Sequence, residues 1–295
     1  MNQGNVVSAA SRGVTHGTEG ASMGEVLVKA GRITLQDAER ILHLQYEQGL
    51  RFGQAGLRLG LLTQADIEFA LSCQFDYPYL VRGKSSISES VVAAYEPRHR
   101  LVERLRELRT QLMLRWFTDN NTRKGLGILS ASRGEGRSFI TANLAVLFSQ
   151  LGRRNLLVDA DMRHPCQHAL FGLDNRIGLS ALLSGRGGPD TIQRIPGLPH
   201  LSVLPAGTTP PNPHELLARP VFGSLLDQLA QQVDVVLIDT PATSESADAQ
   251  VIAVRAGAAM IVVRKNTSRV WRVQGVSNDV SDGRATVVGA VLNDF

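Results

Sequence analysis

The feature that most constrains the fold is a glycine-rich loop between two apolar segments, at residues 128–145 (ILSASRGEGRSFITANLA). The segment begins with a short apolar entry, continues with a loop that has two glycines, and ends in an apolar stretch with helical spacing. This is the order strand, phosphate-binding loop, helix. Gly134 and Gly136 allow backbone N–H groups to point into such a loop, and the start of the following helix adds positive potential for a phosphate. The segment therefore predicts a nucleotide site of the P-loop type.

The loop departs from the usual Walker A pattern at two positions. Ala131 stands where the first glycine is expected, and Arg137 stands where the lysine is expected. Lysine is a compact point charge, whereas arginine is longer, planar and forked. The loop thus predicts nucleotide binding and leaves open whether the site is catalytically active. We expect Ser138 to hold Mg²⁺, and the residues expected to bind the nucleotide are Arg133, Gly134, Glu135, Gly136, Arg137, Ser138 and Phe139.

Length and composition are those of an ordinary globular protein. The 295 residues are 43% apolar and 20% charged, which suits about two domains with one sizeable core. A formal net charge of +4 is too small to indicate a nucleic acid as a partner. Cys73 and Cys166 lie far apart without the spacing of metal ligands, which fits a reducing compartment. With no apolar run as long as a membrane span and no signal-peptide core, we expect a cytoplasmic protein.

Two stretches of 24 residues, 22–45 and 51–74, repeat one another across a five-residue spacer. In register they share Gly24 and Gly53, Gly31 and Gly60, Thr34 and Thr63, Asp37 and Asp66, Leu42 and Leu71, and Gln45 and Gln74. Each half is typical of a short helix, a glycine turn, a threonine cap and a second amphipathic helix. The pair predicts a small helical domain over residues 22–80. Residues 1–21 are rich in Gly, Ser, Asn and Thr, and we expect them to be disordered.

The rest of the chain predicts one larger domain. Residues 81–97 are polar and serine-rich and indicate a linker, and residues 98–118 indicate a helix. Beyond residue 125, apolar strands alternate with helices; the expected strands are 127–131, 155–159, 201–205, 233–239, 258–264 and 287–292, and the expected helices include 139–151, 220–232 and 247–256. Near-continuous Val, Ile and Leu strands joined by helices favour a parallel sheet buried on both faces. We therefore expect an α/β P-loop NTPase domain with a mainly parallel sheet over residues 98–295.

Three acidic residues lie at the ends of expected strands beyond the loop. Asp159 and Asp161 stand in LLVDADMRHP, and Asp239 ends VVLID. The carboxyl ends of parallel strands share one edge of a sheet, so these side chains should converge on the loop. Phosphoryl transfer needs Mg²⁺ and a group that positions or activates the nucleophile. Ser138, Asp159 and Asp239 suit the metal, and Asp161 suits activation of the attacking group.

Each of these residues also has an ordinary structural interpretation. An aspartate at the end of a strand commonly caps a helix or forms a turn. Asn293, at the end of the last expected strand, is a candidate for reading a purine edge, and the alternative is a turn residue.

These motifs resemble those of the bacterial tyrosine kinases of exopolysaccharide synthesis, most closely the cytoplasmic chain-length-determinant kinases of exosortase-linked polysaccharide clusters. The resemblance covers about residues 98–295 and rests on stretches 130–145, 159–163, 178–185, 201–217 and 238–241. It implies the MinD/ParA-like ATPase fold, although the extra signature lysine of that group is Ser132 here. It also implies ATP as the phosphate donor with Mg²⁺, and arginine at position 137 resembles the usage of this subgroup.

The resemblance further implies an assembly and a partner. In that family a Glu-x-x-Arg-x-x-Arg helix lies at the interface of a ring oligomer, and Glu103, Arg106 and Arg109 match it. The alternative is a solvated helix face. Such kinases are stimulated by a membrane-spanning protein, either fused or separate. The resemblance therefore implies a homo-oligomer held at the inner membrane by a separate chain-length-determinant (Wzz-type) activator.

The tyrosines depart from the family pattern. The family autophosphorylates a C-terminal tyrosine cluster, whereas the tyrosines of this chain are Tyr46, Tyr77, Tyr79 and Tyr95. Phosphorylation would have to use another site or act on a partner.

The tandem repeat resembles the N-terminal domain of pilus and type II secretion ATPases, whose repeats bind cyclic di-GMP. Ser22 replaces the arginine expected in the first copy, and Gly56 replaces a leucine expected in the second. The alternative is a degenerate module that docks a protein. The candidate residues for cyclic di-GMP are Arg51, Gly53, Gly60, Gln45 and Gln74.

The leading hypothesis is an ATP- and Mg²⁺-dependent protein-tyrosine kinase that controls the length or export of an exopolysaccharide. Its candidate catalytic residues are Asp161, Arg137 and Asp159. The first alternative is a MinD/ParA-like ATPase switch without tyrosine kinase activity. The second is a non-catalytic scaffold that binds a nucleotide and cyclic di-GMP.

Overall fold

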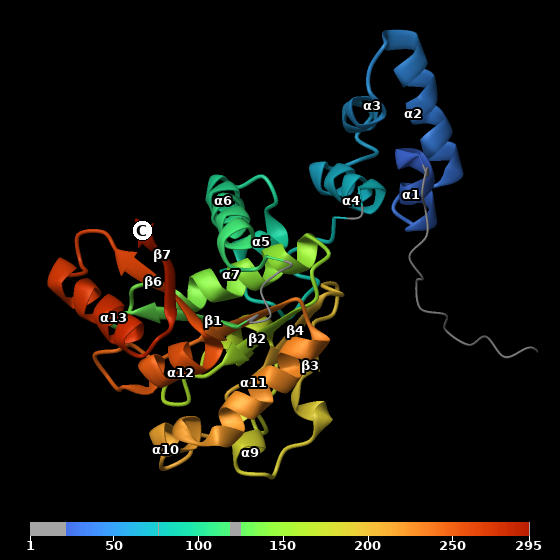
Figure 1. Ribbon diagram of the computed structural model, residues 1–295. Helices are drawn as coiled ribbons and strands as arrows, with labels where there is room; N and C mark the ends of the chain where they lie inside the picture. Colours follow the sequence, from blue (N-terminus) through green and yellow to red (C-terminus); the bar gives the residue numbers. More distant parts are fainter. Residues whose placement is uncertain (1–21, 76, 119–124, 295) are drawn as a thin grey trace, which may run out of the picture. The chain divides into compact units, whose positions relative to one another are not determined.

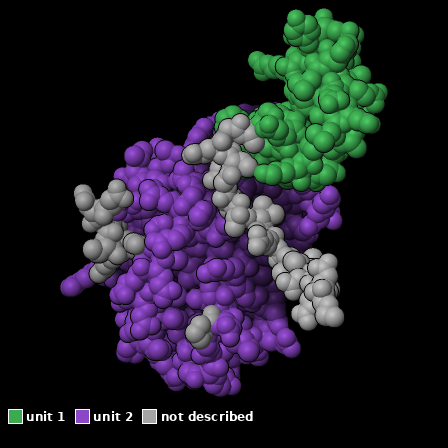
Figure 2. All heavy atoms as spheres, turned by 90° about the vertical axis from the view of Figure 1, so that its right-hand side faces the viewer, with its two compact units in different colours: residues 1–77 green, residues 78–295 purple. Residues whose placement is uncertain are grey.

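The computed structural model describes residues 22–75, 77–118 and 125–294, and the chain divides into two compact units, 1–77 and 78–295 (Figure 2). The expected disordered segment, residues 1–21, lies outside the described residues. No helix of the described part is long and apolar enough to cross a membrane.

The described residues of the first unit form four helices, α1 (Met23–Lys29), α2 (Leu35–Gln48), α3 (Phe52–Arg58) and α4 (Gln64–Gln74). Thr34 and Thr63 cap α2 and α4, each paired with an aspartate three residues on. Gly31 and Gly60 make the preceding turns with φ +67°, a conformation that favours glycine. Each half of this unit therefore consists of a helix, a glycine turn, a threonine cap and a second helix. Helix α1 packs on α4 and α2 on α3, so each half completes the core of the other.

The second unit is built on a seven-stranded sheet of order β3-β4-β2-β5-β1-β6-β7 (Figure 1). The strands are β1 (Gly125–Ser130), β2 (Asn155–Asp159), β3 (Gln193–Arg194), β4 (Leu201–Leu204), β5 (Val235–Asp239), β6 (Ala258–Arg264) and β7 (Thr286–Asn293). All pairings are parallel except that of β3 with β4. The central strands β1, β2 and β5 are buried along their whole length, as Val, Ile and Leu strands covered on both faces should be. The structure confirms the predicted α/β class.

Helices cover both faces of this sheet. On one face lie α5 (Val92–Tyr95), α6 (Arg100–Arg115) and α7 (Arg137–Gln150), which share one apolar cluster with the strands. The helices on the other face form two further clusters; they are α9 (Leu179–Leu183), α10 (Pro213–Ala218), α11 (Pro220–Gln232), α12 (Asp248–Ala256) and α13 (Val270–Asp282). The short α8 (Gln167–Phe171) follows β2. Figure 1 shows α5, α6 and α7 on the side of the sheet opposite to α9 and α10.

Residues 81–97 differ from the expected linker, because they pack on the second unit. Ala93 N–H donates to Asn143 Oδ1 of α7 at 2.9 Å, and Gln150 Nε2 donates to the Ala93 carbonyl at 2.9 Å. Tyr95 is buried, and its hydroxyl donates to the Ile87 carbonyl. The segment carries small apolar residues without a regular period, so its contacts do not show in the sequence pattern.

Candidate nucleotide-binding site

The phosphate-binding loop joins β1 to α7 with the predicted backbone geometry. Gly134 has φ +78° and Gly136 has φ +97°, and both values lie in the region that favours glycine. Gly136 is the N-cap of α7, whose first turn therefore presents free N–H groups to the loop. A concave loop at a helix N-terminus is suited to an anionic phosphate.

Glu135 fixes the shape of the loop from inside. Its side chain is fully buried, its Oε2 accepts the Ser132 N–H at 2.9 Å, and its Oε1 accepts the Ser268 hydroxyl. The Glu135 carboxylate is used within the protein, so the predicted nucleotide contact of this residue would have to come from its backbone. Phe139 packs at the border of the apolar cluster, while Arg133 is exposed, with Nη1 3.9 Å from Glu245.

Asn293 and Arg264 support the same loop from the end of the sheet. Asn293 Nδ2 donates to the Glu135 carbonyl at 2.9 Å, and Arg264 Nη1 donates to the Gly134 carbonyl at 3.2 Å. The predicted role of Asn293 was to read a purine edge. In the structure its amide nitrogen holds the phosphate loop, and the purine-edge role stays a prediction that would use its Oδ1.

Arg137, which stands in the place of the usual lysine, folds back onto neighbouring strand ends. Its Nε donates to the Thr240 carbonyl at 2.9 Å, and its Nη1 donates to the Ser132 carbonyl at 3.1 Å and to the Ser130 hydroxyl. The side chain is only 6% exposed. No bond to Nη2 occurs within the described residues, so this nitrogen can still present two donors to a phosphate.

Asp159 and Asp239 are in register at the carboxyl ends of β2 and β5, and both are fully buried. Burial and the charge of Asp239 hold the pKa of Asp159 well above its usual range. Burial likewise raises the pKa of Asp239, whereas hydrogen bonding and the Arg137 guanidinium lower it. Two adjacent carboxylates in a dry site repel each other, and a divalent cation between them would relieve the repulsion.

The two carboxylates differ in the partners they have. Asp159 Oδ1 accepts the Asp161 N–H at 3.2 Å, and Oδ2 accepts the N–H groups of Cys166 and Gln167 at 3.0 and 2.9 Å. Asp239 Oδ2 accepts Gln167 Nε2 at 2.7 Å, but Asp239 Oδ1 is buried with no hydrogen-bond partner. Asp159 therefore orders the loop after β2, and Asp239 has an oxygen available to a ligand.

Mg²⁺ fits this donor set. The side chain of Ser138 lies beside Asp239 and favours its ionised form, so a hydroxyl and an unpartnered carboxylate oxygen lie together at the start of α7. No three His, Cys, Asp or Glu side chains of the described part are grouped so as to hold a metal by themselves. Mg²⁺ commonly takes one or two protein ligands and completes its shell with water and substrate phosphates. Ser138 and Asp239 would hold the ion, and Asp159 would shape the site.

Asp161 lies at the rim of the same edge and is 5% exposed. Its Oδ1 accepts the N–H groups of Arg163 and His164 at 3.3 and 2.9 Å. Arg163 in turn donates from Nε to Asp248 Oδ2 at 3.2 Å, while His214 Nδ1 lies 2.8 Å from Asp248 Oδ1. The buried Asp248 thus ties the loop of Asp161 to helices α10 and α12, and the Asp161 bonds to backbone N–H groups use Oδ1 rather than Oδ2.

Several residues of this site were not predicted from the sequence. Gln167 is fully buried, and its Nε2 joins Asp239 to the Ser138 carbonyl at 3.1 Å. Burial and Asp239 raise the pKa of the Cys166 thiol to about 12, so the thiol stays protonated beside Asp239 Oδ2, 3.9 Å away. Gln167 falls six residues beyond Asp161 in a stretch without periodicity and outside the stretches that carry the family resemblance, so no sequence signal pointed to it.

The residues expected at an oligomer interface lie on α6. Arg106 Nη1 donates to Glu103 on the same helix, and Arg109 Nη1 donates to the Leu147 carbonyl of α7 at 2.9 Å. Glu103 is the most exposed of the three side chains that were predicted. Within one chain this helix is thus anchored to α7, and its acidic residue faces outward.

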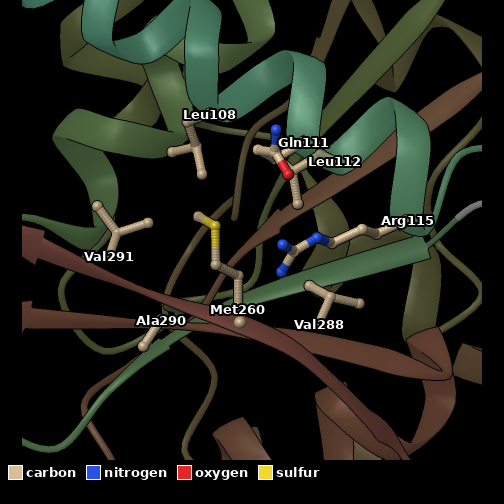
Figure 3. Close-up of a pocket in the computed structure, with 9 residues that line it drawn as sticks. Leu108, Gln111, Leu112, Arg115, Met260, Val288, Ala290 and Val291 are labelled. Carbon is tan, nitrogen blue, oxygen red and sulfur yellow. The ribbon is translucent and has the colours of Figure 1, made fainter.

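A cavity of about 130 Å³ lies between α6 and the edge of the sheet (Figure 3). Its lining residues are Leu108, Gln111, Leu112, Arg115, Met260, Val288, Gly289, Ala290 and Val291. None of them belongs to the phosphate loop or to its acidic edge, so the cavity is separate from the candidate site.

In the first unit, the candidate cyclic di-GMP residues are spread over the helix ends. Arg51 is exposed at the start of α3, Gly60 forms a turn, and Gln45 and Gln74 lie in the last turns of α2 and α4. Gly53 is buried, and a Cβ there would lie 3.0 Å from Ile67. At Gly56, where leucine was expected, a Cβ would lie 2.3 Å from the side chain of Leu62, so the position has no room for leucine as packed here.

Fold and site together define a P-loop nucleotide-binding domain of the MinD type. The crystal structure of MinD from Pyrococcus furiosus matches this chain with a TM-score of 0.51 and 26% identity, and the match covers 58% of this chain and 72% of the MinD chain. The kinase domain of the Escherichia coli tyrosine kinase ETK matches 75% of this chain and 85% of its own, with a TM-score of 0.67 and 28% identity. Tyrosine-protein kinase YwqD of Bacillus subtilis is 32% identical over 209 residues, which are 71% of this chain and 87% of YwqD. No family model matches the chain. The chain belongs to the bacterial tyrosine-protein kinase family.

Proposed function

We propose that this protein transfers the γ-phosphate of ATP to tyrosine in the regulation of exopolysaccharide chain length or export. The observation that carries the catalytic part is the unpartnered Oδ1 of Asp239 beside Ser138 at the end of a phosphate-binding loop. Family membership supports the tyrosine as acceptor, and the resemblance of residues 98–295 to exopolysaccharide kinases supports the process.

The contacts of these residues give each of them a different role. The backbone of Gly134 and Gly136 and the first turn of α7 bind the phosphates, and Ser138 and Asp239 hold Mg²⁺. The ion neutralises charge on the phosphate oxygens. Asp161, whose Oδ1 is used by backbone N–H groups, receives the acceptor proton on Oδ2. Arg137 positions the loop through Nε and Nη1 and reaches the phosphates through Nη2.

The test uses γ-labelled ATP, Mg²⁺ and a synthetic Glu/Tyr copolymer, with and without the cytoplasmic segment of a membrane-spanning activator. Labelled phosphotyrosine supports the kinase, and its loss in Asp161→Asn assigns the transfer to this site. Release of free phosphate without phosphotyrosine would favour the ATPase switch. Nucleotide binding without either product would favour the scaffold. The matched control is Asp190→Asn, an exposed aspartate of a surface turn.

The partner and location follow from the resemblance. We infer a separate Wzz-type membrane protein as the activator, which would hold this chain at the cytoplasmic side of the inner membrane. The family membership of the chain supports this inference. Co-purification with the activator from detergent extracts tests this inference, and recovery of the chain without it would contradict it.

We also infer that α6 takes part in a homo-oligomer. Glu103 is 58% exposed, while Arg109 is fixed to α7, so the helix can present one charged row to a second copy without losing its own packing. Glu103→Arg should lower the mass measured by light scattering, and the exposed Glu39→Arg of α2 serves as the control. An unchanged mass of the Glu103 variant would overturn the inference.

For the first unit we infer cyclic di-GMP as a ligand, with the protein-docking module as the rival. The tandem helical repeat and the exposed Arg51 support it, because an arginine fork suits guanine edges and phosphates. The arginine missing at Ser22 and the filled space at Gly56 predict weak binding. Calorimetry of the full chain with cyclic di-GMP should give a heat of binding. Arg51→Ala should abolish this heat, and the exposed control Arg40→Ala should retain it. Absence of heat with the unmodified chain would refute the inference.

A further inference from the structure

The structure separates the four tyrosines of the chain by access to their hydroxyl groups. Tyr95 is 6% exposed, and its hydroxyl donates to the Ile87 carbonyl. Tyr79 is half-buried and its hydroxyl oxygen is buried, and Tyr77 is also half-buried. Tyr46 is 92% exposed. A phosphoacceptor must place its hydroxyl oxygen against a phosphate, and only the side chain of Tyr46 stands free for this among the four tyrosines.

From this difference we propose that Tyr46 is the tyrosine of this chain that the kinase site phosphorylates, a proposal that rests on the proposed kinase function. Tyr46 lies in the last turn of α2, in the first unit, and not near the end of the chain.

The local structure around Tyr46 suits an acceptor. The last buried residue of α2 is Ile41, and residues 46–49 are all exposed. Gly49 ends the helix in the left-handed conformation with φ +63°. The final turn can therefore unwind into an active site without exposing core residues, and short terminal turns open at low cost.

The charges near Tyr46 also fit the rim of the kinase site. Glu47 follows Tyr46 and is 55% exposed, and its Oε2 lies 3.4 Å from His43 Nδ1. Arg133 of the phosphate loop is 62% exposed. Because unlike charges favour encounter, an acidic residue beside the acceptor suits a loop with an exposed arginine better than a basic residue would.

The transfer balances with the groups already described. The phenolic oxygen of Tyr46 bonds to the γ-phosphorus of ATP, and the bond from that phosphorus to the bridging β–γ oxygen breaks. ADP leaves with the electron pair, and the phenolic proton passes to the carboxylate of Asp161. The products are phosphotyrosine, ADP and one proton.

The experiment incubates the full chain with Mg²⁺ and ATP and maps phosphotyrosine by peptide mass spectrometry. We expect phosphate on Tyr46 in the unmodified chain, and Tyr46→Phe should reduce incorporation into the chain to the level of Asp161→Asn. The matched control Tyr79→Phe should keep the incorporation. Because the Tyr46 side chain is so exposed, Tyr46→Phe should melt at the same temperature as the unmodified chain and should still phosphorylate the Glu/Tyr copolymer.

The outcomes separate this proposal from the function on which it rests. Phosphorylation of the copolymer with no phosphate on Tyr46 would overturn the acceptor and leave the kinase. Phosphate on Tyr77, Tyr79 or Tyr95, or on an added activator alone, would also overturn it. A chain that phosphorylates neither the copolymer nor itself would contradict the kinase function, and the acceptor with it.

Discussion

Asp159 and Asp239 occupy paired positions on the adjacent parallel strands β2 and β5, and neither side chain is exposed to solvent. Asp159 accepts three backbone N–H groups, whereas Asp239 keeps one oxygen without a partner. One member of the pair thus shapes the loop, and the other is the one that we propose to hold a cation. We expect the same pair to make the site sensitive to metal and to pH.

Asp239→Asn should remove most of the Mg²⁺ dependence of ATP binding. Asparagine can keep the bond from Gln167, but it places an amide or a neutral oxygen where the cation needs a charged ligand. We expect ATP affinity in the presence of Mg²⁺ to fall at least about tenfold, and affinity in EDTA to change little. Titration with a fluorescent ATP analogue checks this, with the exposed Asp227→Asn as the control. Equal losses with and without Mg²⁺ would place the metal elsewhere.

The nucleotide-free protein should lose stability as the pH rises. The pKa values of Asp159 and Asp239 are raised in the folded state, so the folded chain binds more protons than the unfolded chain above the ordinary carboxyl pKa. Stability is then greatest below that pKa and falls as the pH rises through the folded-state values. Urea unfolding followed by the buried Trp116 between about pH 4 and pH 8 measures this.

The control for the predicted pH dependence of stability is the variant Asp239→Asn. Asp239→Asn removes one charge of the pair, so its stability should fall less steeply with pH, and Mg²⁺ with ATP should flatten the curve of the unmodified chain. A curve that is the same with and without Asp239 would show that the pair does not control it.

Asn293→Ala should weaken the binding of ATP and the binding of GTP by the same factor. The side chain holds the Glu135 carbonyl, and loss of one such bond is worth about 1 kcal/mol, or about fivefold in affinity. A role in reading the base would instead change the ratio of the two affinities. Competition titrations of both nucleotides decide between these roles, and a shifted ratio would support the purine-edge interpretation.

Arg137→Lys should retain nucleotide binding and reduce stability. A lysine ammonium can approach the phosphates, but it cannot satisfy the Thr240 and Ser132 carbonyls and the Ser130 hydroxyl from a planar fork. We expect a loss of about 1–3 kcal/mol in the free energy of unfolding. Urea unfolding and ATP titration measure both effects. The comparison variant is Arg137→Met, which should lose binding as well; a Lys variant that no longer binds ATP would contradict the placement of this side chain.

The elements that follow from local pattern were predictable. Strands 155–159 and 258–264 agree with β2 and β6, because a buried parallel strand is a run of apolar residues with clear ends. The convergence of Asp159 and Asp239 was predictable too, since parallel strands bring their carboxyl ends to one edge.

The features that could not be predicted from the sequence depend on single contacts between distant segments. The bond of Arg137 to Thr240 spans 103 positions and that of Asn293 to Glu135 spans 158, and no periodicity encodes them. The packing of residues 81–97 depends in the same way on Asn143 and Gln150 of α7, which satisfy the backbone of Ala93. The resemblance to a family could name the residues of the site, but it could not assign their partners.

The most direct test of the central claim is the rate of phosphotyrosine formation at saturating ATP and Mg²⁺ in the unmodified chain and in Asp161→Asn. We expect kcat to fall about a hundredfold or more in the variant, because proton acceptance by a positioned carboxylate contributes a factor of this order. The affinity for ATP should stay nearly unchanged, since Asp161 holds its loop through Oδ1 and asparagine keeps that acceptor. Equal rates in the two proteins, or no phosphotyrosine in either, would contradict the account.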